Sequence, residues 1–237
     1  MSEASDPPAA PASVPRRSTL PAALTVLTVV SGIVDAVSYL GLGRVFAANM
    51  TGNVVVMGFA AAGAPGFSAL GSLTCLGAFL AGAVCAGRLT GVFAERAREI
   101  WVRSVFVTEA VLLAVATAVA FAWPGEATYA LIAVLAGAMG LRNATVRKLA
   151  VPDMTTTVLT MTLTGLASES SLAGGTGVRT GRRMVSVVAM VAGATLGALL
   201  VLHHGLGWPL LVGTLLVAAT AAGYREPAAD AGDVRSA

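Results

Sequence analysis

The sequence predicts an all-α polytopic membrane protein with six transmembrane helices and two short re-entrant or broken helices, arranged as an inverted 3+3 repeat. Of its 237 residues, 56% are hydrophobic and 11% are charged, whereas soluble domains carry about 25% charged residues. Apolar runs recur along the chain at close to the roughly 20 residues that a helix needs to cross the hydrocarbon core. A polar motif that occurs twice, together with the distribution of arginine and lysine, predicts the repeat.

The membrane segments follow a Pro-, Ala- and Ser-rich tail, residues 1–18, that ends in a basic anchor and that we expect to be disordered. We expect a first membrane repeat over 19–126, a second over 127–225, and a disordered tail over 226–237. The eight apolar segments are 20–40, 49–63, 69–87, 104–123, 128–147, 154–170, 184–202 and 208–224.

Segments 49–63 and 154–170 differ from the others because each is short and follows a break that contains glycine or proline. Each also opens with residues that cap helices, Asn49 and Thr51 in one case and Asp153 and Thr155 in the other. These two segments are the predicted re-entrant helices.

The two halves match each other residue by residue around these breaks. The matches pair Gly32 and Ala36 with Gly140 and Ala144, Asp35 with Asn143, Met50-Thr51 with Met154-Thr155, and Ala78, Gly82 and Ala86 with Ala189, Gly193 and Gly197. Small residues at every fourth position let helix backbones approach closely in lipid. The pattern predicts that one structural unit occurs twice.

Charge counting sets the predicted orientation, because loops that carry Lys and Arg are retained in the cytoplasm. If segments 49–63 and 154–170 each enter and leave on the same side, all basic loops are cytoplasmic and Arg44 alone among 15 basic residues faces out. Both termini are then cytoplasmic. The first helix of the first half then runs in the opposite direction to the first helix of the second half. Many transporters and some channels are built from such inverted repeats.

The stretch Gly32–Asn53 contains Asp35-Ala36, Tyr39-Leu40, Phe46 and Asn49-Met-Thr-Gly-Asn53, and the second half contains Arg142-Asn143-Ala144 and Thr155-Thr156. On these residues the chain resembles the YoaK family of bacterial integral membrane proteins, over about residues 20–224. The resemblance implies a bacterial inner-membrane location. The family is of uncharacterised function, so the resemblance implies no activity, substrate or catalytic residue.

The candidate site lies where the two re-entrant helices meet. Asn49, Thr51 and Asn53 would sit at one half-helix N-terminus, and Asp153, Thr155 and Thr156 at the other. Free N–H groups and the positive dipole ends of helices suit an anion or a polar solute. The alternative is that these residues cap their helices and brace the two halves.

Asp35, Arg142 and Asn143 are the candidate gating or coupling residues. Asp35 is a proton- or cation-coupling carboxylate, a partner of Arg44 or Arg142, or an acceptor for exposed backbone. Arg142 either snorkels to the interface or contacts the ligand. For Glu109 we expect pairing with an arginine of the loop 88–103, or snorkelling, rather than a role in transport.

The sequence favours a secondary transporter or channel for a small polar solute or ion, with an accessory or structural membrane protein as the alternative. We expect no enzyme, because no nucleophile with a base, metal cluster or cofactor motif is present. Basic residues scattered at segment ends do not indicate nucleic acid. Cys75 and Cys85 are about 15 Å apart along one helix, too far for a disulfide. The expected partners are the lipid bilayer, an unknown solute and, as an open question, further copies of the chain.

Overall fold

The computed structural model describes residues 19–92, 98–149, 159–170, 173–174 and 180–226. These residues form eight α-helices and no strand. The helices are α1 (Leu20–Gly41), α2 (Met50–Ala61), α3 (Ala69–Val92), α4 (Arg98–Ala122), α5 (Thr128–Leu149), α6 (Leu159–Ser168), α7 (Thr180–His204) and α8 (Gly207–Gly223). Each helix corresponds to one apolar segment, which confirms the all-α class.

Helix length separates two groups of segments. Helices α1, α3, α4, α5 and α7 are long and apolar enough to cross a membrane. Helix α8 has 17 residues, α2 has 12 and α6 has 10, so they extend over roughly 25, 18 and 15 Å. The chain is therefore a multi-pass α-helical membrane protein, in which α8 is slightly shorter than a hydrocarbon core of about 30 Å and α2 and α6 are much shorter than it.

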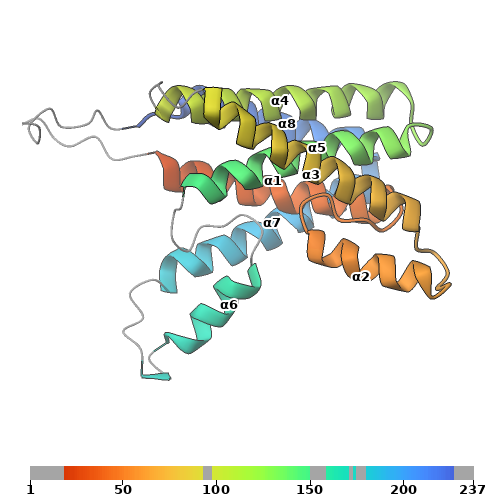
Figure 1. The fold of residues 1–237 in the computed structure, drawn as a ribbon, viewed down its shortest axis with the longest axis horizontal. Coiled ribbons are helices and arrows are strands. Elements are labelled where there is room, and N and C mark those ends of the chain that lie inside the picture. The colour runs from red at the N-terminus through yellow and green to blue at the C-terminus, as the bar shows by residue number, and fades with distance from the viewer. Residues whose placement is uncertain (1–18, 93–97, 150–158, 171–172, 175–179, 227–237) are drawn as a thin grey trace, which may run out of the picture.

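The long helices lie side by side along the longest axis of the molecule (Figure 1). Helix α1 packs against α7 and α8, α5 packs against α3 and α4, and α4 packs against α8. Helix α2 packs on α3, and α6 packs on α7. Exchanging the first four helices for the last four maps α1–α7 onto α3–α5, α1–α8 onto α4–α5 and α2–α3 onto α6–α7, and it maps α4–α8 onto itself.

Glycines allow the closest of these contacts. A Cβ atom on Gly32 would collide with the Met190 carbonyl of α7, and one on Gly140 would collide with the Phe79 carbonyl of α3. The pairs Gly193–Val29 and Gly82–Gly137 are equally tight. The small-residue motifs of the sequence therefore lie at the α1–α7 and α3–α5 contacts, as their spacing predicts.

Helices α2 and α6 stand apart from the main bundle in Figure 1. Helix α2 starts near the middle of the molecule and runs toward the end at which α1 ends and α3 begins. Helix α6 runs toward the opposite end, where α7 begins. Each short helix thus leads the chain back to one end of the bundle.

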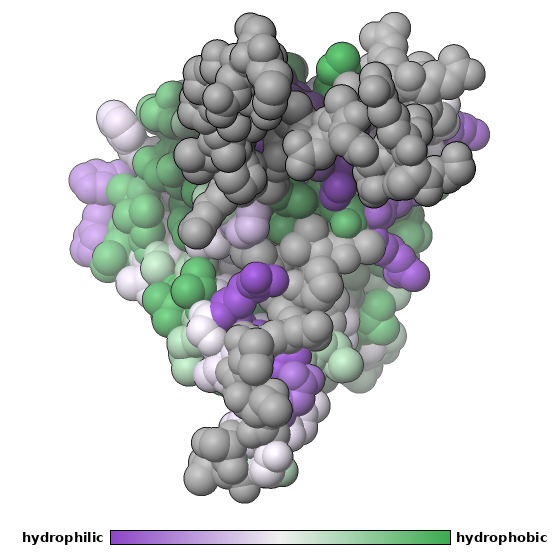
Figure 2. All heavy atoms as spheres, turned by 90° about the vertical axis from the view of Figure 1, so that its left-hand side faces the viewer, coloured by the Kyte–Doolittle hydropathy of each residue, from purple (hydrophilic) through white to green (hydrophobic). Residues whose placement is uncertain are grey.

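Basic side chains gather at the end of the bundle where α1, α4 and α7 begin. Arg98 of α4, Arg147 and Lys148 of α5, and Arg182 of α7 are exposed and belong to helix ends on this side. Figure 2 looks onto this end and shows hydrophilic residues beside the hydrophobic flanks. These basic residues, which the sequence predicts to share one side of the membrane, thus lie at one end of the folded chain.

Candidate functional site

Asn53 holds the loop between α1 and α2 in place. Its Oδ1 accepts the Phe46 N–H at 2.8 Å, and its Nδ2 donates to the Phe46 carbonyl at 2.6 Å. The same Nδ2 lies 3.2 Å from the Sγ of Cys75 on α3, and that thiol donates to the Phe46 carbonyl at 3.3 Å. Asn53 is fully buried, so its amide replaces the backbone partners that Phe46 lacks.

Asp35 and Ser38 hold the same loop from the side of α1. The Oδ1 of Asp35 accepts the Ala48 N–H at 2.8 Å, and the Ser38 hydroxyl accepts the Ala47 N–H at 3.1 Å. Ala47 and Ala48 of this loop are buried, and protein groups satisfy the N–H groups that lack a helical partner there. Of the alternatives open for Asp35, the structure places it as an acceptor for exposed backbone.

Asn49 and Thr51 lie at the start of α2. Asn49 is its N-cap, and its side chain accepts the Gly52 N–H at 3.4 Å. Thr51 is exposed. The Asn49–Asn53 motif is thus used largely to cap α2 and to fix the loop before it.

A charged pair lies buried between α4 and α5. Arg142 donates through Nε to Oε1 of Glu109 at 2.8 Å, and its second terminal nitrogen also contacts Oε1. Both side chains are fully buried. The remaining guanidinium nitrogen reaches α1, where it donates to the Leu27 carbonyl at 2.7 Å and to the Ser31 hydroxyl at 2.8 Å.

This pair corrects two expectations. Glu109 does not pair with an arginine of 88–103, and Arg142 does not snorkel to the interface. The physical reason is that α4 begins at Arg98, so Glu109 lies eleven residues into the helix, about 16 Å from its start. The sequence did contain a signal for this pair, because Glu109 and Arg142 are an acidic and a basic residue that each lie within an apolar run.

Asp35 belongs to the same buried region as the pair. It is on α1 one turn beyond Ser31, and Arg142 interacts electrostatically with it. Asn143, the neighbour of Arg142, is half-buried. The hydrogen bonds of Arg142 go to Glu109, which the sequence argument had set aside, and to α1 at Leu27 and Ser31.

The second predicted cluster lies outside the described residues, because Asp153, Thr155 and Thr156 precede the start of α6 at Leu159. Nearby, Arg183 of α7 donates to the Gly165 carbonyl at 2.6 Å and binds Glu169 at 2.9 Å. Arg183 is 5% exposed. It ties α6 to α7, as Asn53 and Cys75 tie the α2 region to α3.

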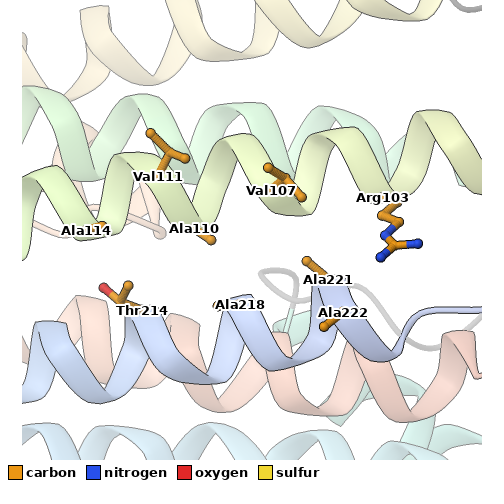
Figure 3. Close-up of a pocket in the computed structure, with 9 residues that line it drawn as sticks. All are labelled: Arg103, Val107, Ala110, Val111, Ala114, Thr214, Ala218, Ala221 and Ala222. Carbon is orange, nitrogen blue, oxygen red and sulfur yellow. The ribbon is translucent and has the colours of Figure 1, made fainter.

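Among the described residues no group of three or more His, Cys, Asp or Glu side chains is placed to hold a metal ion. A groove of about 390 Å³ lies between α4 and α8 (Figure 3). Its lining is apolar except for Arg103 and Thr214, and the other residues are Val107, Ala110, Val111, Ala114, Ala218, Ala221 and Ala222. This lining suits hydrocarbon better than a polar solute.

Long apolar helices around the buried pair of Glu109 and Arg142 define a polytopic α-helical membrane protein. Residues 23–223 match the family described as protein of unknown function (DUF1275), and the chain belongs to this family. It is 34% identical over 151 residues to the UPF0700 transmembrane protein YoaK of Bacillus subtilis (strain 168), which confirms the YoaK resemblance. That match covers 62% of this chain and 66% of the relative's length. No solved structure matches the chain.

Proposed function

We propose that this chain is a secondary transporter or channel for a small polar solute or ion. The observation that carries the proposal is the fully buried pair of Glu109 and Arg142, joined to α1 and close to Asp35. Burying charge in a membrane interior is costly, and such residues usually mark solute pathways or proton relays. Well-packed apolar residues would often give equal or greater stability than a buried ion pair, so stability alone does not account for it.

The proposed architecture is an inverted repeat of three spanning helices and one re-entrant helix per half, with α1, α3, α4, α5, α7 and α8 spanning. Three observations support it: the helix pairs exchange under the repeat, the tight glycine contacts occur at matched positions, and α2 and α6 run toward opposite ends. In proteins of this kind, sites lie near the midplane where the repeats meet.

The proposed pathway follows that interface. On the first half it passes Asn49, Thr51 and Asn53, with Asp35 beside them, and on the second half Asp153, Thr155 and Thr156, with Arg142 and Asn143 gating or coupling. We place the protein in the bacterial inner membrane with both termini cytoplasmic, because basic helix ends gather on one side of the bundle.

The second candidate function is that of an accessory or structural membrane protein. One observation favours it: Asn53, Asp35 and Ser38 are engaged with the backbone of their own loop. These polar residues brace the fold, whatever else they do. The Glu109–Arg142 pair distinguishes the two candidates, because bracing does not require charge there.

The test is flux through liposomes that contain the purified protein. Urea, glycerol and sodium chloride gradients report solute entry through changes in vesicle volume, and an entrapped pH-sensitive dye reports proton entry. The matched variant is Glu109→Leu with Arg142→Met, which removes both charges, so that neither partner of the pair is left buried without the other. We expect the parent to exceed empty liposomes for at least one probe and the double variant to lose that flux while remaining folded. A folded parent that equals empty liposomes for every probe, or a double variant with full flux, would favour the structural role.

A further inference from the structure

We propose that the groove between α4 and α8 binds one anionic phospholipid, with an acyl chain between the two helices and the phosphate on Arg103. This lipid site goes beyond the proposed function, because it does not depend on whether the chain moves a solute. Three features support it: the groove opens toward lipid, its inner part is apolar, and its charge lies at the end nearest the membrane surface.

The groove opens toward the outside of the helix bundle. Its walls come from one face of each helix, since the lining positions on α4 and on α8 recur every three or four residues. Val111 and Ala114 of α4 and Ala218 and Ala222 of α8 are exposed, so a ligand enters from the side, where lipid surrounds a membrane protein. The small alanine side chains leave a space of about 390 Å³ between the helices.

The groove has the depth of one leaflet. It extends from Arg103, five residues after the start of α4 at Arg98, to Ala114, eleven residues further on. Eleven residues extend over roughly 16 Å of helix, and half of a hydrocarbon core of about 30 Å is close to this length. These dimensions suit an acyl chain whose headgroup lies at the membrane surface.

The inner part of the groove offers no free polar group to a ligand. Thr214 lies there, and its hydroxyl donates to the Leu210 carbonyl at 2.8 Å and is 3.0 Å from the hydroxyl of Thr117 on α4. A polar solute in this part would lose its hydrogen bonds to water without replacing them. A hydrocarbon chain has no such bonds to lose.

Arg103 supplies positive charge at the other end of the groove. Figure 3 shows its side chain extending from α4 toward the last turn of α8. Arg103 makes no ion pair with the residues that the structure describes, because Glu99, one helical turn earlier, accepts the Glu226 N–H at 3.2 Å. Glu226 in turn pairs with Arg98 at 3.1 Å. The guanidinium of Arg103 is therefore available to a phosphate, to which arginine donates two parallel hydrogen bonds.

A second groove beside α8 provides an internal comparison. It lies between α1 and α8, has a volume of about 360 Å³ and contains no charged side chain in its lining. Ala218 and Ala219 are adjacent exposed residues of α8, and each lines one of the two grooves. Because basic pockets between transmembrane helices bind anionic headgroups, we expect the groove that contains Arg103 to prefer an anionic lipid and the other to show no such preference.

The test is native mass spectrometry of the purified full-length protein in detergent, titrated with phosphatidylglycerol or with phosphatidylcholine that has the same acyl chains. We expect the parent to bind one phosphatidylglycerol more tightly than phosphatidylcholine. Arg103→Gln should lower the affinity for phosphatidylglycerol about fivefold, the effect of one basic residue near an anionic surface. Arg88→Gln is the matched control and should change nothing, because Arg88 is exposed near the same end of the bundle and does not line the groove.

Two leucine substitutions on α8 test the place of the acyl chain. Ala218→Leu fills the α4–α8 groove and should weaken phosphatidylglycerol binding, whereas Ala219→Leu fills the uncharged groove and should leave it unchanged. Thermal unfolding checks that each variant is folded, and Ala114→Leu fills the same groove from α4 if Ala218→Leu does not fold.

Four results overturn the proposal. The parent binds both lipids equally, or Arg103→Gln and Arg88→Gln have equal effects. A loss with Arg103→Gln but not with Ala218→Leu assigns the binding to the headgroup alone, as for an arginine that extends to the surface outside any groove. A dimer that Ala218→Leu abolishes assigns the groove to a second copy of the chain.

Discussion

Asn53 pairs with both backbone groups of Phe46, since it accepts the N–H at 2.8 Å and donates to the carbonyl at 2.6 Å. The two residues are seven positions apart and lie on opposite sides of the turn into α2. A side-chain amide thus completes the hydrogen bonding of a residue that lies in neither helix. In a membrane protein this matters more than in water, because lipid offers no replacement partner.

Replacing Asn53 by alanine should therefore destabilise the protein. The Phe46 N–H loses its partner and the Phe46 carbonyl keeps only the Cys75 thiol, and a buried group left unsatisfied costs about 1–3 kcal/mol. We expect the unfolding temperature in detergent to fall by several degrees. Thr51→Val is the control, because Thr51 is exposed on the same helix, and it should change stability by less than about 0.5 kcal/mol. Equal effects of the two substitutions would show that the Phe46 contact is not what stabilises this loop.

Two glycines of α5 should respond differently to alanine. A Cβ on Gly140 would collide with the Phe79 backbone of α3, whereas one on Gly137 meets the Ala78 carbonyl at an ordinary 3.7 Å. We expect Gly140→Ala to separate α3 from α5 and to cost about 1–3 kcal/mol or more. Gly137→Ala should be close to neutral, as measured by thermal unfolding of the purified protein.

The repeat gives this glycine test an internal comparison. Gly32 lies against the Met190 carbonyl of α7 in the same way as Gly140 lies against the Phe79 carbonyl of α3. Gly32→Ala should therefore be about as destabilising as Gly140→Ala. A tolerated Gly140→Ala would contradict the close α3–α5 packing. A tolerated Gly32→Ala beside a harmful Gly140→Ala would argue that the two halves are not packed alike.

Arg183 should be needed to hold α6 against α7, because it binds the Gly165 carbonyl and Glu169. We expect Arg183→Met to expose α6 to limited proteolysis while the long helices stay protected. Arg182→Met is the matched control, since Arg182 is the exposed neighbour in the chain. If the two variants are cleaved at the same rate, α6 is held by contacts other than those of Arg183.

The helices could be predicted because long apolar runs are separated by polar or glycine-containing stretches. Asn49 is an example, since its role as N-cap of α2 follows from residue type and position. The glycine contacts were likewise visible as small residues at every fourth position. The start of α2 and the surfaces at which the long helices meet could therefore be predicted from local sequence.

The partner of Glu109 was not predictable in the same way. Pairing depends on the depth at which two antiparallel helices lie side by side, and no local pattern fixes that depth. Three arginines of 96–103 placed the start of α4 too late, whereas the buried Trp101 and Val102 belong to its first turns. That error placed Glu109 near the membrane surface, where pairing with an arginine of 88–103 was expected.

The orientation of the two short helices is tested by cysteine labelling with an impermeant reagent. In the α4–α5 turn, Gly125 has a positive φ of 85° that disfavours a side chain, so its exposed neighbour Glu126 is the better site for a cysteine. Ala62, just after α2, reports on the α2–α3 turn, and position 97 reports on the chain immediately before α4. Cys85 is exposed and is removed, whereas Cys75 is buried and is retained because it bonds to the Phe46 carbonyl.

Intact cells that produce Ala62→Cys or Glu126→Cys should label from outside, and those that produce Ala97→Cys should label only after lysis. This follows because α2 leads back to the end at which α3 begins, the same end as the α4–α5 turn (Figure 1). Thr19→Cys, at the start of α1, is compared with them, because re-entry of α2 places Thr19 on the opposite side from Ala62 and Glu126. If α2 crossed the membrane instead, Thr19 would lie on the same side as Ala62 and Glu126. The halves would then run in the same direction, and the buried charges of Glu109 and Arg142 would no longer lie at the junction of two opposed repeats.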